Sequence, residues 1–182
     1  MFTSRILFSI LCFIIASSSW LPSGNLLTSQ FVKSNKANEL IALATKELVV
    51  REEGCENCGL RIKEYLNYSG VNIPAPWCAA FVSFIFKEAD FKSPKTAWSP
   101  SLFPTNRITK VPNPGCVLGI YSLSLKRIAH CGIVKMVKGD LIYSIEGNTN
   151  IGGEREGDGV YSKVRSKHTV SVYADWLKGG AK

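Results

Sequence analysis

Four residues of this chain have types that cooperate in nucleophilic catalysis: Cys78, His130, Glu146 and Asn148. A cysteine thiolate is a strong nucleophile, and an imidazole can remove the thiol proton as a general base. The imidazole must itself be held in one orientation, which a carboxylate or an amide can do. These residue types predict covalent catalysis with Cys78 as nucleophile, His130 as base, and Glu146 or Asn148 as the orienting residue. The alternative is that Cys78 is only a small buried hydrophobic residue.

Cys78 is predicted to lie in the first turn of an amphipathic helix. Pro74 and Pro76 cannot lie inside a helix, whereas apolar residues recur afterwards at three- and four-residue spacing: Ala79, Ala80, Val82, Ile85, Phe86 and Ala89. The helix therefore begins at or just after Trp77, where unpaired N–H groups and the helix dipole stabilise a thiolate. Trp77 either packs beneath this helix or lies at the rim of the cleft as a stacking platform for a sugar.

The base and the orienting residues are predicted to lie on strands. From Val111 onward the apolar pattern changes from helical to strand-like, and the segments 130–137 and 141–145 are joined by a short turn. As antiparallel neighbours, these strands would place His130 and Glu146 nearly opposite each other and facing the helix that carries Cys78. Helices followed by an antiparallel sheet predict an α+β fold.

Three motifs occur in order along the chain: Trp77-Cys78-Ala79-Ala80-Phe81-Val82, His130-x-Gly132-Ile133-Val134, and Ile145-Glu146-Gly147-Asn148-Thr149. In these motifs the chain resembles the CHAP family of cysteine peptidoglycan hydrolases, relatives of the NlpC/P60 and papain-like enzymes. The resemblance spans about residues 38–166. It implies a papain-like fold, with N-terminal helices packed on an antiparallel sheet, and a Cys78, His130, Glu146 and Asn148 site.

The resemblance also bears on ligands. It implies that peptidoglycan or its peptide fragments are the substrate, and that Asn57 is a substrate or oxyanion contact, although an Asn completing a turn is the alternative. We expect no cofactor and no metal. The family usually has Gly-Asp where this chain has Gly115-Cys116, and the missing carboxylate, together with Cys131, predicts a disulfide between the two strands.

The N-terminal region predicts export. Residues 6–16 form an apolar run that is short for a bilayer span and is followed by three serines, so residues 1–19 are interpreted as a signal peptide. An uncleaved membrane anchor is the alternative. We expect a linker at 20–38, a catalytic domain at 39–178, no membrane span after signal removal, and a secreted, periplasmic or cell-envelope location.

Cysteine number supports a free thiol. Six cysteines minus Cys12 in the signal leaves five, and an odd number in an oxidising compartment leaves at least one unpaired, for which Cys78 is the natural candidate. Cys55 and Cys58 are interpreted as disulfide cysteines, bonded to each other or to distant cysteines, with a zinc ligand pair or a redox motif as alternatives. The sequence alone does not separate the three possible pairings of Cys55, Cys58, Cys116 and Cys131.

The net charge of +8 favours an anionic partner. The basic residues are scattered and do not alternate with aromatic residues, so we expect a cell-wall polymer rather than nucleic acid, and a monomer. The predicted function is a secreted amidase or endopeptidase acting on peptidoglycan. The alternatives are a catalytically inactive cell-wall-binding domain of the same fold and a Cys-x-x-Cys redox or zinc protein.

Overall fold

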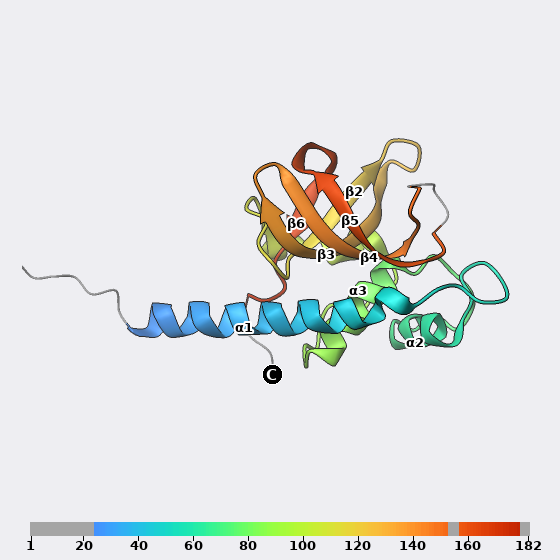
Figure 1. Ribbon diagram of the computed structural model, residues 1–182, viewed down its shortest axis with the longest axis horizontal. Helices are drawn as coiled ribbons and strands as arrows, with labels where there is room; N and C mark the ends of the chain where they lie inside the picture. The colour runs from blue at the N-terminus through green and yellow to red at the C-terminus, as the bar shows by residue number, and fades with distance from the viewer. Residues whose placement is uncertain (1–23, 153–156, 179–182) are drawn as a thin grey trace, which may run out of the picture.

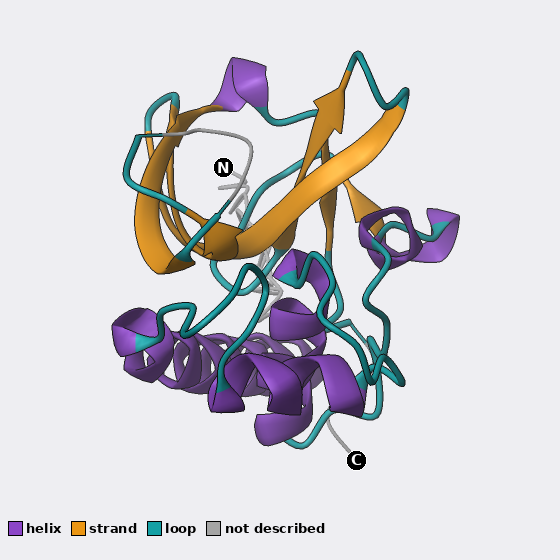
Figure 2. Ribbon diagram, turned by 90° about the vertical axis from the view of Figure 1, so that its right-hand side faces the viewer, coloured by secondary structure: helices purple, strands orange, loops and turns teal. Residues whose placement is uncertain are grey.

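The protein has an α+β fold, as predicted, in which helices cover one face of a six-stranded antiparallel sheet (Figures 1 and 2). The structure is a computed structural model that describes residues 24–152 and 157–178. The predicted signal peptide, 1–19, lies outside these residues. No helix in the described part of the chain is long and apolar enough to cross a membrane.

The helices are α1 (Gly24–Lys46), α2 (Leu60–Tyr68) and α3 (Cys78–Glu88), with short 3-10 helices η1 (Glu47–Val49), η2 (Ser99–Leu102), η3 (Thr105–Arg107) and η4 (Lys167–Thr169). The strands are β1 (Ile108–Thr109), β2 (Val117–Ser122), β3 (Arg127–Lys138), β4 (Leu141–Thr149), β5 (Gly159–Ser166) and β6 (Val172–Ala174). Their order in the sheet is β1-β6-β2-β3-β4-β5, so β3 has β2 on one side and β4 on the other, and β4 lies between β3 and the edge strand β5.

Helix α3 is the centre of the main hydrophobic core. Every residue from Cys78 to Phe86 is buried, because one side of the helix packs on α2 and the other on β3 and β4. A helix that is apolar on all sides is stable only when it is enclosed in this way. The helix begins at Cys78, so the proline and periodicity pattern predicted its start correctly.

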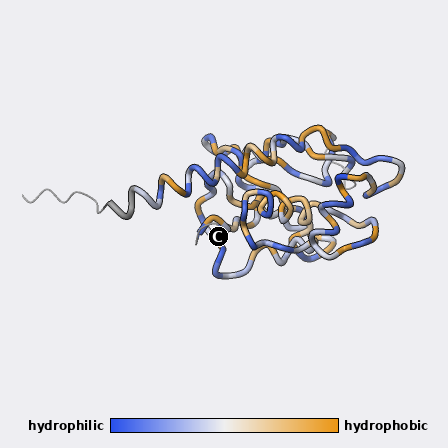
Figure 3. Tube along the Cα trace, turned by 90° about the horizontal axis from the view of Figure 1, so that it is seen from below, coloured by the Kyte–Doolittle hydropathy of each residue, from blue (hydrophilic) through white to orange (hydrophobic). Residues whose placement is uncertain are grey.

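The N-terminal segment differs from the predicted linker. Residues 24–38 belong to α1, and the first turns of this helix extend beyond the sheet (Figure 1). Among residues 28–46 of α1 the buried positions are Ala37, Leu40 and Ala44. Residues 28–36 include no buried residue, so periodicity alone did not reveal this part of the helix; Figure 3 colours the chain by hydropathy.

The register of β3 and β4 brings the predicted base and acid together diagonally rather than directly opposite. Ile133 pairs with Ile145, so Gly132 lies opposite Glu146 and His130 is two residues further along β3. A Cβ on residue 132 would overlap the Cγ of Glu146. Glycine at this position therefore gives the Glu146 side chain room to lie across β3 toward His130.

The cysteine pairing differs in part from the prediction. Disulfide use by Cys55 and Cys58 is confirmed, and the bond joins them to each other, whereas Cys78, Cys116 and Cys131 are free thiols. The predicted bridge between Cys116 and Cys131 is wrong. Cys131 on β3 pairs with Gly119 on β2, and Cys116 lies three residues before Gly119. Because side chains alternate between the two faces of a sheet, this odd separation places the two thiols on opposite faces, in separate hydrophobic clusters.

Candidate active site

The Cys78 thiol lies at the N-terminus of α3, and its Sγ is 3.3 Å from the Ser99 Oγ. The Cys131 thiol and the His130 imidazole lie close enough to lower its pKa. Cys78 is 4% exposed, so the sulfur is almost removed from bulk water. Cys78 therefore has polar neighbours that can stabilise its thiolate or accept its proton, which a purely hydrophobic role would not require.

The His130 ring is held by a buried carboxylate. His130 Nε2 lies 2.8 Å from Glu146 Oε2, and Glu146 is fully buried. An ionised carboxylate only accepts hydrogen bonds, so Nε2 carries the proton and Nδ1 is the nitrogen left to exchange a proton with Cys78. Of the two predicted orienting residues, Glu146 has the geometry for this task.

Glu146 in turn is satisfied by two other donors. Arg165 on β5 donates from Nε to Oε1 at 2.9 Å and from Nη2 to Oε2 at 2.5 Å, and the Ser144 hydroxyl donates to Oε1 at 2.5 Å. A buried carboxylate is stable only with such partners, and a bidentate arginine also fixes its plane. Arg165 and Ser144 therefore position the group that positions His130.

These contacts lower the pKa of Cys78 and of Glu146 and raise the pKa of His130. The hydrogen bond from Cys131, together with the His130 charge and the Ser99 hydroxyl, lowers the pKa of Cys78 well below its ordinary 9.0 against the opposing effect of burial. Burial opposes the charged imidazole, but Cys78 and Glu146 outweigh it and raise the pKa of His130 to about 9. Burial likewise opposes ionisation of Glu146, but Arg165 and His130 lower its pKa to about 2. The shifts therefore favour transfer of the Cys78 proton to His130, beside an ionised Glu146.

These pKa shifts predict the pH dependence of the reaction. Thiolate chemistry is expected to start well below pH 9, and hydrolysis is expected to decline as the pH rises through about 9, because deprotonated His130 cannot protonate a leaving amine. Iodoacetamide labelling of Cys78 and peptide hydrolysis, each measured from pH 4 to 10, test this. Labelling that follows the pH dependence of N-acetylcysteine would contradict the proposed ion pair.

Sequence reasoning missed four residues around the site: Ser99 and Cys131, which neighbour Cys78, and Ser144 and Arg165, which donate to Glu146. Ser99 opens η2 in a proline-rich segment interpreted only as a connecting loop or short helical turn. Cys131 was assigned to a disulfide, whereas it remains free and its buried thiol has a pKa raised by burial and by the Cys78 charge. Arg165 lies on β5, and no motif in the sequence linked it to Glu146; the pairing of β4 with β5 brings the two together.

The other predicted site residues form a second polar cluster around Glu52. Glu52 Oε1 accepts from Trp77 Nε1 at 2.9 Å, and Oε2 accepts from the Asn57 backbone N–H at 2.7 Å. Asn148 Nδ2 donates to Asn57 Oδ1 at 3.1 Å. Asn148 therefore joins β4 to the 52–58 loop and makes no described hydrogen bond to His130.

Trp77 does not lie at a cleft rim. It is fully buried, and its ring packs at 5.8 Å from the Tyr65 ring and against Gly147, where a Cβ would come within 2.7 Å of the indole. The predicted role as a substrate platform is therefore wrong, and the alternative in which Trp77 packs beneath the helix is correct. The Trp77 indole ring fills the space between α2, α3 and β4.

The buried position of Trp77 makes a stability prediction. Trp77→Phe is expected to lower the free energy of unfolding by about 1–3 kcal/mol, because the Glu52 carboxylate loses a donor and the core loses ring volume. Urea denaturation measures this loss. Trp98→Phe, at a tryptophan that is 52% exposed, is the control and should change stability by less than about 0.5 kcal/mol. A raised KM without loss of stability in Trp77→Phe would restore the platform interpretation.

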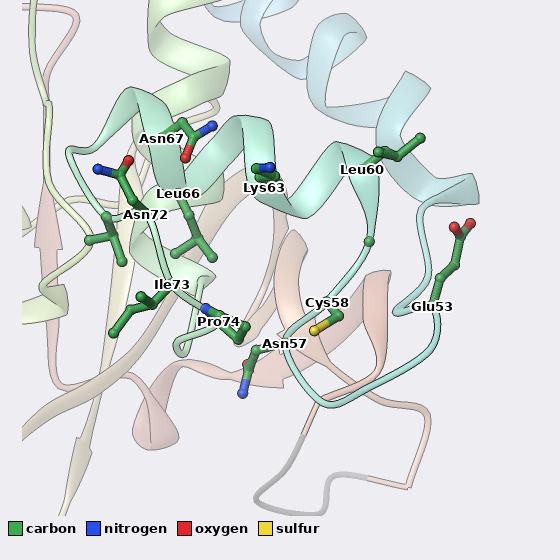
Figure 4. Close-up of a pocket in the computed structure, with 12 residues that line it drawn as sticks. Glu53, Asn57, Cys58, Leu60, Lys63, Leu66, Asn67, Asn72, Ile73 and Pro74 are labelled. Atoms are coloured by element: carbon green, nitrogen blue, oxygen red, sulfur yellow. The ribbon is translucent and has the colours of Figure 1, made fainter.

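A pocket of about 450 Å³ lies beside the disulfide loop (Figure 4). It is bounded by the 53–59 loop, by α2 and by the 71–74 segment that leads into α3. Asn57 contributes to its wall, so a substrate contact by Asn57 stays a prediction. The hydrogen bonds of the Asn57 side chain in the structure are with Glu56 and Asn148 rather than with the sulfur site.

No protein-family model and no curated protein matches this chain. Among solved structures, it is similar to one described as the crystal structure of Ly7917, with 18% sequence identity and a TM-score of 0.43. The similarity covers 75% of this chain and 60% of that one.

Proposed function

We propose that this protein is a secreted cysteine hydrolase with a papain-like site that cleaves amide bonds of peptidoglycan, as an amidase or an endopeptidase. The observation that carries the proposal is that His130, whose Nε2 is 2.8 Å from Glu146 Oε2, also lies close enough to the Cys78 sulfur to lower the pKa of that thiol. A nucleophile, a base and an orienting carboxylate in contact are the parts required for acyl transfer through a covalent intermediate.

In the acylation step the Cys78 thiolate attacks the amide carbonyl carbon and a tetrahedral oxyanion forms. The backbone N–H of Cys78, in the first turn of α3, has no acceptor within the helix and is available to this oxyanion. The His130 imidazolium then donates its proton to the leaving nitrogen, the C–N bond breaks, and the acyl group remains on sulfur as a thioester.

In the deacylation step His130, now neutral, removes a proton from water as the water attacks the thioester carbon. The C–S bond breaks, the carboxylic acid product leaves, and the thiolate-imidazolium pair is restored. Glu146 stays ionised throughout and keeps Nε2 protonated, which leaves Nδ1 free for each proton transfer.

The choice of peptidoglycan rests on the motif resemblance, the predicted export signal and the basic charge of the chain, which favours an anionic wall polymer. The test is digestion of purified peptidoglycan, with new amino and carboxyl ends identified by mass. We expect paired new ends at one type of amide bond. Retention on the polymer with no new ends would instead establish the binding-domain alternative.

A further inference from the structure

An arginine stacks on an exposed tryptophan that directly precedes Ser99, a neighbour of the nucleophile. The Arg127 guanidinium carbon is 4.1 Å from the centre of the Trp98 ring, and Trp98 is 52% exposed. Trp98 directly precedes Ser99, whose hydroxyl touches the Cys78 sulfur. Arg127 begins β3, three residues before His130, a span of about 10 Å along a strand. Two separate elements therefore place this pair beside the reacting groups.

Arg127 has no acidic partner among residues 24–152 and 157–178, in contrast to Arg61 and Arg165, which are both paired with glutamates. Its described contacts are the Trp98 ring and the Ile128 carbonyl, which accepts from Nη1 at 3.0 Å. Stacking on an aromatic face fixes the plane of a guanidinium and leaves its N–H edge available. The remaining N–H groups are thus oriented, and no carboxylate in the described part of the chain accepts from them.

We propose that Arg127, held by Trp98, binds a carboxylate of the substrate close to the scissile amide, so that the preferred substrate is an acidic peptide. A planar guanidinium matches a carboxylate through two parallel N–H···O bonds, and the indole shields one side of this pair from water. The inference deepens the proposed function, on which it rests, because it names the group that the site recognises. Neither residue was singled out by the sequence motifs.

The test compares two reagents that alkylate Cys78 by the same reaction. In each, the thiolate attacks the methylene carbon, an S–C bond forms and iodide leaves. Iodoacetate carries a carboxylate where iodoacetamide carries a neutral amide. We expect Arg127→Gln to slow iodoacetate about tenfold and to change the iodoacetamide rate less than twofold. Arg127→Lys, which keeps the charge but not the fork or the stack, should fall between.

Lys126→Gln is the matched control, because it removes the same charge from the neighbouring exposed position. It should leave the ratio of the two alkylation rates near the wild-type value. With peptide substrates, amidation of the carboxylate should raise KM about tenfold for the wild type and have no effect on Arg127→Gln.

The two levels of the proposal fail in different ways. If Cys78 of the wild type reacts no faster than an ordinary thiol, the proposed hydrolase site is wrong and this inference with it. If Cys78 is reactive but Arg127→Gln slows both reagents equally, slows neither, or matches Lys126→Gln, the carboxylate site alone is overturned. A ratio that changes only in the Arg127 variants supports it.

Discussion

Replacement of Cys78 by alanine is expected to reduce amide hydrolysis by about 10³-fold or more while the protein stays folded. The substitution removes the only atom proposed to form the acyl intermediate. The two neighbouring side chains that carry a hydroxyl or a thiol, Ser99 and Cys131, are both buried. Release of new ends from purified peptidoglycan measures the activity, and thermal unfolding followed by circular dichroism reports the fold.

Cys116→Ala is the matched control for this experiment. Cys116 is also a buried free thiol, but it belongs to the hydrophobic cluster on the other face of the sheet. The same change of side chain should therefore cost about 1 kcal/mol of stability or less and leave hydrolysis within twofold. If Cys78→Ala retained the wild-type rate, or if both variants lost activity equally, Cys78 would not be the nucleophile.

The second large effect is expected for Glu146→Gln, in which hydrolysis falls by at least about 10²-fold and the free energy of unfolding by about 3 kcal/mol. A glutamine has one acceptor oxygen and an NH₂ group, so it must direct a donor at either Arg165 or His130, both of which are donors themselves. The imidazole then loses its fixed tautomer, and the partly buried guanidinium loses its counter-ion.

The pH dependence of this stability loss separates it from a general packing defect. Because the pKa of Glu146 is lowered from 4.5 to about 2, the carboxylate contributes stability above pH 4.5, and this contribution is lost as the pH falls toward 2. Urea denaturation should therefore show a wild-type advantage over Glu146→Gln at pH 6 that shrinks between pH 4.5 and 2. An advantage that does not change with pH would contradict the role of the charge.

Glu64→Gln provides the comparison for a surface carboxylate. Glu64 is on α2, its side chain is 55% exposed, and it pairs with Arg61. An exposed ion pair of this kind contributes little, so the variant should lose less than about 0.5 kcal/mol and no activity. If the Glu146 variant lost as little stability and activity as the Glu64 variant, the contact between Glu146 and His130 would not be required for hydrolysis.

The sequence was most informative where structure depends on near neighbours. The start of α3 at Cys78 follows from two prolines and a run of apolar residues, all within about a dozen positions of the cysteine. The contact between His130 and Glu146 follows from one tight hairpin between adjacent strands. In both cases the residues that fix the structure lie close together in the sequence, so the sequence pattern predicts the structure.

The predictions that were wrong concern which side of an element faces which neighbour. Trp77 precedes an apolar helix in either interpretation, and only the packing of α2 and β4 around it buries the ring. Cys116 and Cys131 lie on adjacent strands, but the observed register separates them across the sheet. The first turns of α1 lack an apolar stripe, so their helical state was not indicated by periodicity.

By itself, therefore, the sequence determined the α+β class, the helix that presents Cys78 and the hairpin that joins His130 to Glu146. Only the tertiary structure decided that Glu146 rather than Asn148 holds the imidazole, and that Arg165, Ser99 and Cys131 complete its surroundings. The physical reason is that these contacts join residues of different elements. Their formation depends on strand register, twist and the close packing of side chains, which are properties of the whole assembled core and not of any short segment.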